Sequence, residues 1–240
     1  MKKIVILCFI VCIIGTVFYV DAHSDHGQIF ACNSPKIQHG GLGLANIESG
    51  YPDFPTTKDC GELVKHKSLS LMYCEKYEEP IWVSYILTKE EITSSDKLER
   101  YNKFSADPLV QTGSAVTSDY SKTGFDRGHL APNADMNWDQ ASMEECFYMS
   151  NITPQKPEFN RGIWKSLEET VRKWAVKYDS LYIVTGPDLK GVTDFIGKKN
   201  QVGVPKYFYK VILDVKGTNI RASPFISQTK GATNRFIIML

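Results

Sequence analysis

The stretch from residue 126 to residue 168 constrains this chain most, because it gathers reactive side chains at short spacings. It opens with Asp126-Arg127-Gly128-His129, and an asparagine-containing run from Ser150 to Gln155 follows. A third run extends from Asn160 to Glu168. Together they supply a neutral base, an arginine and several side-chain oxygens. That set suits metal-assisted hydrolysis of a phosphodiester, which needs a base for water, a hard oxygen ligand and a cation for the phosphate.

An amphipathic helix is predicted from Asn160 to about Tyr178, because apolar residues recur there at spacings of four, four and three. These residues are Ile163, Leu167, Val171 and Trp174. Asn160, Trp164 and Glu168 are four apart and should share one helix face, where an amide and a carboxylate can look into a cleft. The residues alone leave simpler interpretations open. Asn160 can be a helix N-cap, and Glu168 an exposed helix carboxylate.

The remaining chain predicts an α+β fold. Two strand-like runs, 68–74 and 81–87, flank an acidic turn at 75–80 and are expected to form a hairpin. Pro154 and Pro157 should prevent a helix before Asn160. We therefore expect a central antiparallel sheet with helices packed on it. Further strands are predicted at 147–152, 181–185 and 204–215.

The first residues have the pattern of a secretion signal. Lys2 and Lys3 precede an apolar run from Ile4 to Val20, and small residues allow cleavage after Ala22. The alternative is an uncleaved anchor, but the run is at the short limit of a membrane span. We expect cleavage, a secreted or periplasmic product, and no stable membrane association afterwards.

Net charge argues against a protein that binds polyanions by bulk charge. The chain has 28 Lys and Arg against 27 Asp and Glu, and loss of residues 1–22 removes two basic residues and one acidic residue, leaving 26 of each. Residues 190–240 are basic, however, with nine Lys and Arg against two Asp. These lysines either present a positive face to a polyanion or only keep the surface solvated. The candidates for such a face are Lys198, Lys199, Lys206 and Lys210.

Four cysteines remain after the expected cleavage, namely Cys32, Cys60, Cys74 and Cys146. An even number in an exported chain predicts disulfides, although four cysteines allow three pairings. Their spacing does not match a zinc site.

Three segments carry a resemblance to a known family: Phe125 to Pro132, Tyr148 to Gln155, and Asn160 to Glu168. They resemble the DNA/RNA non-specific endonucleases, which contain a ββα-metal finger. Weaker similarity extends upstream to 81–85 and downstream to 182–187 and 204–205. The resemblance implies the same finger here, and DNA and RNA as substrates.

The resemblance also implies a division of roles at the site. Asn160 would be the only protein ligand of a divalent cation, Mg²⁺ or else Mn²⁺. Mg²⁺ fits because it keeps several waters. His129 would be the general base, since a neutral imidazole with a pKa of roughly 6.5 can take a proton at pH 7. Glu168 would hold a metal-bound water.

Five further positions match the family less directly. Arg127 would clamp phosphate or tie the motif to the sheet, and Arg100 is the best candidate for an upstream phosphate-contacting arginine. Asn151 and Gln155 match polar positions that support the metal site and the substrate. Asp126 fits a structural acceptor better than a ligand. Asn151-Ile152-Thr153 is formally a glycosylation triplet, but a glycan would sit at the proposed site, so we do not expect one.

The sequence thus predicts a signal peptide at 1–22, an irregular lead-in at 23–60 and a nuclease domain at 61–240. The expected function is a secreted, metal-dependent endonuclease that does not discriminate between the sugars of DNA and RNA. One alternative is a catalytically silent nucleic-acid-binding module with the same fold. The joint presence of His129 and Asn160 argues against it, because a binder needs no base beside a metal ligand. A disulfide-stabilised structural or adhesion protein is a second alternative.

Overall fold

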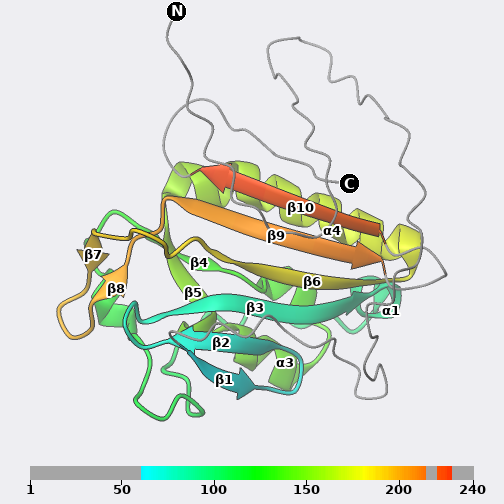
Figure 1. The fold of residues 1–240 in the computed structure, drawn as a ribbon. Coiled ribbons are helices and arrows are strands. Elements are labelled where there is room, and N and C mark those ends of the chain that lie inside the picture. The colour runs from blue at the N-terminus through cyan, green and yellow to red at the C-terminus, as the bar shows by residue number, and fades with distance from the viewer. Residues whose placement is uncertain (1–60, 215–220, 229–240) are drawn as a thin grey trace, which may run out of the picture.

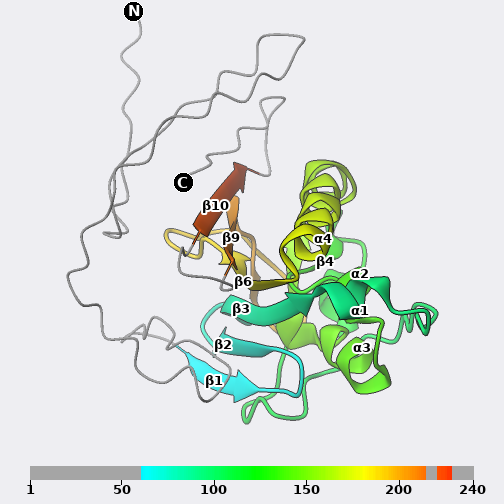
Figure 2. The same cartoon turned by 90° about the vertical axis from the view of Figure 1, so that its right-hand side faces the viewer.

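The computed structural model describes residues 61–214 and, by backbone alone, residues 221–228. These form one large sheet with helices packed against one face (Figures 1 and 2). The predicted signal peptide, its cleavage after Ala22 and the lead-in at 23–60 lie outside the described residues. Among the helices that are described, none combines the length and hydrophobicity needed to span a membrane.

The large sheet has six strands, and every neighbouring pair is antiparallel. This confirms the predicted central antiparallel sheet and the hairpin around the acidic turn at 75–80. β3 and β6 extend beyond the predicted runs 81–87 and 181–185, whereas β2 and β9 begin later than the predicted runs 68–74 and 204–215. In sheet order the strands are β1 (Glu62–Lys65), β2 (Ser70–Cys74), β3 (Glu79–Thr88), β6 (Ser180–Pro187), β9 (Tyr207–Asp214) and β10 (Arg221–Gln228).

The main core lies between the sheet and its helices, because alternate strand residues point to the same face. Val83, Tyr85 and Leu87 of β3 all belong to this core, as do Leu167 and Val171 of the long helix α4. Figure 2 shows the helices gathered on one side of the strands. They are α1 (Lys89–Thr93), α2 (Asn133–Met136), α3 (Gln140–Cys146) and α4 (Lys165–Tyr178).

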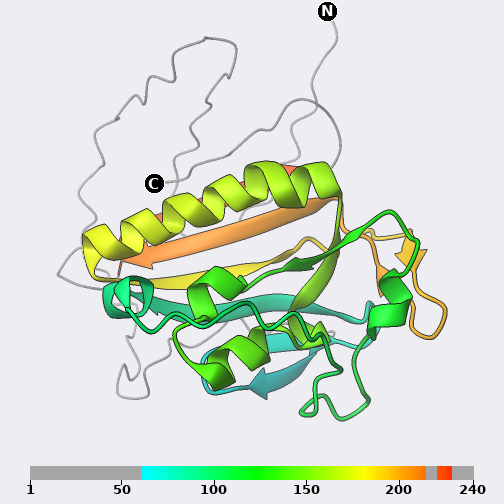
Figure 3. The same ribbon diagram turned by 180° about the vertical axis from the view of Figure 1, so that it is seen from behind.

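A short two-stranded ribbon lies on the helical side of the sheet (Figure 3). It pairs β4 (Asp126–His129) with β5 (Ile152–Gln155), and the segment that leads into α4 follows β5 directly. This is the strand, strand and helix order of the predicted ββα finger. A second small ribbon pairs β7 (Phe195–Ile196) with β8 (Val202–Gly203).

Two local predictions around β5 are wrong. Residues 147–152 do not form a strand, since Met149–Asn151 is a 3₁₀ turn and β5 begins at Ile152. Asn151 uses its side chain to bond neighbouring backbone, which competes with strand pairing. Helical structure also begins at Pro157 rather than at Asn160. Proline is acceptable there, because the first helical position needs no N–H partner.

The predicted single α-helix is divided into two parts. Phe159–Trp164 is a π-helical segment in which Gly162 has non-helical angles (φ −99°, ψ −108°), and α4 starts at Lys165. The regular α-helical spacing assumed between Asn160 and Trp164 is therefore interrupted, and the common face of Asn160, Trp164 and Glu168 stays a prediction. Trp164 is only 1% exposed, and its ring lies 5.8 Å from that of Phe208 in the core. The apolar stripe itself is confirmed, with Leu167 and Val171 buried.

The cysteines correct another expectation. Cys146 is a free, buried thiol in α3, so the prediction that it joins a disulfide is wrong. Cys74 at the end of β2 is disulfide-bonded. Cys32 and Cys60 lie outside the described residues, and the pairing therefore stays a prediction.

Gly186 in β6 gives a test of the strand packing. A Cβ built on it would lie 2.3 Å from the carbonyl oxygen of Ile81, a backbone atom that cannot move aside cheaply. Gly186→Ala should therefore lower the free energy of unfolding by about 1–3 kcal/mol, the usual cost of overpacking. Chemical denaturation measures it. Gly203→Ala is the matched control, because its Cβ would meet only side-chain atoms at 3.2 Å or more. An equal loss in both variants would contradict the described packing of β6.

Candidate active site

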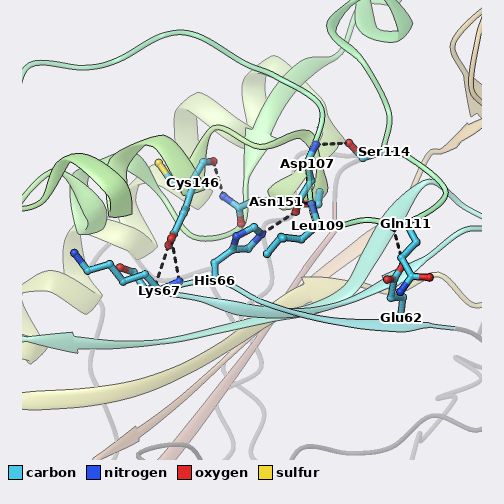
Figure 4. A network of polar contacts seen from close by, with 12 residues as sticks. Glu62, His66, Lys67, Asp107, Leu109, Gln111, Ser114, Cys146 and Asn151 are labelled. Atoms are coloured by element: carbon cyan, nitrogen blue, oxygen red, sulfur yellow. Dashed lines mark hydrogen bonds and ion pairs between the residues drawn. The ribbon is translucent and has the colours of Figure 1, made fainter.

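Strand β4 places His129 at its last position, opposite Ile152 of β5. The turn that follows His129 is held by Asn151, whose side chain accepts a hydrogen bond from Ala131 N (3.0 Å) and donates to Ala131 O (2.9 Å). The same amide donates to the carbonyl of Cys146 at 2.8 Å (Figure 4). Asn151 is fully buried, so its side chain is not accessible to a glycan or to a bound substrate. It instead supports the turn that follows His129.

Two aromatic rings enclose His129. Its ring centroid lies 4.8 Å from that of Phe147 and 5.4 Å from that of Phe104. A guanidinium group lies over each of these rings. That of Arg100 is 5.3 Å from the Phe147 centroid, and that of Arg127 is 4.2 Å from the Phe104 centroid. The structure thus brings both predicted arginines beside the predicted base. Such cation–π contacts hold a charge in place without neutralising it.

His129 is held in its neutral form. The residue is 9% exposed, and its Nε2 has no hydrogen-bond partner among the described residues. Burial, together with the charges of Arg100 and Arg127, lowers the pKa of His129 to about 3. At neutral pH the imidazole therefore carries a free lone pair, which is the state that a general base requires.

Asn160 lies inside the helical segment, and not at its start. Its backbone N–H donates to the carbonyl of Lys156 at 2.8 Å, so the N-cap interpretation is wrong. Its side-chain Nδ2 donates to Oδ2 of Asp126 at 3.0 Å. A carboxylate only accepts, and this contact therefore turns the amide nitrogen toward Asp126 and the amide oxygen away. Within the described chain no donor reaches Oδ1 of Asn160, which leaves that oxygen available to a hard cation.

Asp126 is occupied by its neighbours. Both its oxygens accept from Arg161, with Nε 2.8 Å from Oδ2 and Nη2 2.6 Å from Oδ1. Partial burial tends to raise the pKa of Asp126, but the hydrogen bonds from Arg161 and Asn160 outweigh it and lower that pKa. This geometry fits a structural acceptor, as the sequence suggested, rather than a metal ligand.

Glu168 belongs to a buried cluster of charges between α4 and the sheet. Arg172 donates to Asp135 at 2.9 Å, and the hydroxyl of Tyr85 donates to the same carboxylate at 2.8 Å. Burial raises the pKa of Glu168 to about 8, while Lys210 opposes the rise and Asp135 adds to it. Lys210 links this cluster to the residue next to His129, because its ammonium donates to the carbonyl of Leu130 at 3.3 Å.

Lys210 has a structural role that was not predicted. It is 1% exposed, and its Nζ lies 4.9 Å from the centre of the Trp164 ring, so both alternatives for it, a face toward a polyanion and a solvated surface, are wrong. The signal was present, because Lys210 stands between Phe208 and Ile212 in the alternating pattern of a strand, at an inward position. Lys198, Lys199 and Lys206 are exposed.

Gln155 is buried against β4. A Cβ on Gly128 would lie 2.3 Å from Gln155 Oε1, so glycine at this position makes room for the glutamine side chain. Neither amide atom of Gln155 has a hydrogen-bond partner among the residues described. From this position the Gln155 side chain fills the space beside Gly128 and packs the two strands of the ribbon together.

A second buried carboxylate supports the segment before Asn151. Asp107 pairs with His66 Nε2 at 2.8 Å (Figure 4) and also accepts a hydrogen bond from the hydroxyl of Ser150. His66 comes from the turn between β1 and β2, and Asp107 from the loop after Phe104. The network therefore ties the edge of the sheet to the segment that positions Asn151.

The lowered pKa of His129 predicts a pH dependence of stability. The pKa of this histidine falls from about 6.5 in the unfolded chain to about 3 in the folded protein. Below pH 6.5 the unfolded chain therefore binds a proton that the folded protein does not, and stability present above pH 6.5 is lost as the pH falls toward 3. The slope for one proton is at most about 1.4 kcal/mol per pH unit. His129→Gln should remove this loss, as measured by urea denaturation between pH 7 and pH 4.

The comparison must use the difference between wild type and variant. Glu168 and other buried carboxyl groups with raised pKa values act in the opposite direction, and their contributions cancel in that difference. Parallel curves for the two proteins would show that His129 keeps its ordinary pKa in the fold.

Several known nucleases are similar to this chain. Human mitochondrial endonuclease G is 32% identical over 175 residues, which cover 69% of this chain and 59% of that protein. Nuclease C1 of Cunninghamella echinulata is 34% identical over 169 residues, covering 66% and 67%. The chain thus spans a little under three fifths of the length of human endonuclease G.

The fold agrees with these similarities. A crystal structure of EndoG in complex with EndoGI, described as showing the mechanism of EndoG inhibition, has a TM-score of 0.65 at 29% identity and covers 74% of this chain and 76% of that one. The family model for DNA/RNA non-specific endonucleases matches residues 47–237. This chain belongs to the DNA/RNA non-specific endonuclease family.

Proposed function

We propose that this protein is a metal-dependent endonuclease that hydrolyses the phosphodiester bonds of DNA and RNA. One observation carries the proposal: a single four-residue strand holds both the neutral base His129 and Asp126, the partner that orients Asn160. Three residues of a strand span about 10 Å, which places the proposed base and the carboxylate that orients the proposed ligand at the two ends of one rigid element. A silent binding module would not need a buried imidazole kept free of hydrogen bonds.

His129 is proposed to remove the proton from the attacking water. A pKa of about 3 makes the free imidazole a weak base, and a catalytic base is most effective when its pKa lies near the working pH. Part of that low value comes from Arg100 and Arg127. A phosphate group bound between the two guanidinium groups would offset their charge and raise the basicity of His129. The substrate would thereby strengthen the base that acts on it.

Asn160 is proposed as the ligand of one divalent cation through its free Oδ1. The described residues contain no group of three or more His, Cys, Asp or Glu side chains suited to a metal, so a site built on one amide must leave most positions to water and phosphate. Mg²⁺ accepts that arrangement, and Mn²⁺ prefers similar oxygen ligands. When bound, the cation would stabilise charge on the phosphate and on the departing oxygen. Glu168 is proposed to orient a water there.

The proposed substrate contacts explain a lack of sequence preference. Arg127 is exposed beside the base, and Arg100 lies on the other ring that contacts His129. Contacts to phosphate fix the position of a nucleic acid but carry no sequence information. Arginine suits this role because its planar group can bind two phosphate oxygens at once. Both DNA and RNA offer the same backbone phosphate.

Export is part of the proposal and rests on the N-terminal sequence alone. The charged start, apolar run and small residues before position 23 form the pattern of a cleaved signal. The similar endonuclease G proteins are named as mitochondrial. Fractionation of the native host, with mass spectrometry of the mature N-terminus, tests the proposed cleavage after Ala22.

Two substitutions separate the roles at the site. His129→Ala should lower the rate of plasmid cleavage by about 10²–10⁴-fold, the usual cost of losing a general base. Asn160→Ala should instead raise the Mg²⁺ concentration needed for half-maximal activity. The assays are plasmid nicking and RNA cleavage over a Mg²⁺ series, with EDTA as the blank and circular dichroism to confirm folding. More than half the wild-type rate in folded His129→Ala would remove His129 from the mechanism.

A further inference from the structure

We propose that Arg161 is a positioning residue for the metal ligand, acting through Asp126 on the orientation of the Asn160 amide. The inference rests on the proposed metal site at Asn160. Arg161 lies outside the motif at 126–129. In the described structure it contacts neither His129 nor the two aromatic rings beside His129.

The contacts form a chain of three side chains. Arg161 places Nε 2.8 Å from Oδ2 and Nη2 2.6 Å from Oδ1 of Asp126, which is the two-pronged geometry of a guanidinium on a carboxylate. Asn160 Nδ2 shares the same Oδ2 at 3.0 Å. The arginine therefore fixes the plane of the carboxylate, and the carboxylate fixes the plane of the amide.

The orientation of the amide matters because its two ends differ chemically while having nearly the same shape. The oxygen is a hard metal ligand, whereas the NH₂ end repels a cation. Rotation by 180° would present the wrong end, and the ionised carboxylate prevents this because it can only accept. Arg161 also holds both carboxylate oxygens, so that Asp126 does not itself compete for the cation.

The backbone supports this interpretation independently. Asn160 and Arg161 are adjacent, and adjacent side chains of an α-helix do not face a common partner. Here both reach one carboxylate, within the π-helical segment Phe159–Trp164. Single π-helical turns occur frequently at functional sites. The irregular segment is thus what lets two consecutive residues converge on Asp126.

Simple electrostatics predicts the opposite effect, which makes the proposal testable. Arg161 is a cation near a cation site, and its side chain is 71% exposed. If it acted only by charge, its removal would reduce repulsion and tighten metal binding. If it positions Asn160, its removal must weaken metal binding, and loss of such a supporting contact typically costs about 10–100-fold in affinity.

The test is a titration of the metal-free full chain with Mn²⁺, in which the electron paramagnetic resonance signal of the free ion gives the dissociation constant without any activity assay. Arg161→Gln should raise the constant by about 10-fold or more. Arg161→Lys keeps the charge but loses the two-pronged guanidinium, so its dissociation constant should lie between those of Arg161→Gln and the wild type. Lys165→Gln is the matched control, because it removes the same charge four residues away from an exposed side chain whose ion pair among the described residues is with Glu169. An unchanged or tighter constant in Arg161→Gln overturns the proposal.

Three further proteins complete the experiment: Asp126→Asn, its combination with Arg161→Gln, and Asn160→Ala. In an Asp126→Asn background, Arg161→Gln should have no additional effect, because the arginine acts through the carboxylate. An additional loss there would mean a separate role and would overturn the inference. Melting temperatures should move by less than about 4 °C in Arg161→Gln, since exposed ion pairs contribute little to stability. Asn160→Ala identifies the other failure: if it binds Mn²⁺ like wild type, the proposed metal site itself is wrong.

Discussion

One hydrogen bond joins the turn after His129 to the large sheet, from the buried ammonium of Lys210 in β9 to the carbonyl of Leu130. An isolated buried charge is costly, and this one is acceptable because Glu168 and Asp135 compensate it. The same group therefore fixes the residue after His129 and opposes the rise in the pKa of Glu168. Asp135 has further partners in Arg172 and Tyr85, so the cluster joins α4, β3 and β9 around one carboxylate.

The ribbon of β4 and β5 contains three buried polar atoms that have no partner within the described chain. His129 Nε2 and both amide atoms of Gln155 are buried and unbonded within the described chain. Unsatisfied buried groups reduce stability, and native structures retain few of them. Their grouping beside the base fits a site whose hydrogen bonds are completed only by water and substrate. The aromatic walls and the support from Asn151 supply the rigidity that these atoms do not.

The sequence predicted what depends on local pattern or on a distinctive motif. Strand-like runs identified β2, β3, β6 and β9 but not the outer strands β1 and β10, and the tetrapeptide at 126–129 with the later asparagines pointed to the candidate site. The failures have one physical cause, which is tertiary packing that overrides local propensity. A π-helical turn around Gly162 leaves the apolar period of α4 intact, so periodicity could not reveal that the predicted helix is divided before Lys165. Cys146 carried no sequence sign of being enclosed in the core.

The order of strands in the sheet has a consequence for how the molecule must assemble. Strands β3 and β6 are neighbours at the centre of the sheet, yet the whole chain from residue 89 to residue 179 lies between them. That excursion contains β4, β5, α4 and every residue assigned to catalysis here. Closing so long a loop costs entropy before any central pairing rewards it, which slows folding. It also places the residues proposed for catalysis in one continuous insertion between β3 and β6. The surface loops of that insertion can lengthen at little thermodynamic cost while the pairing of the sheet stays unchanged.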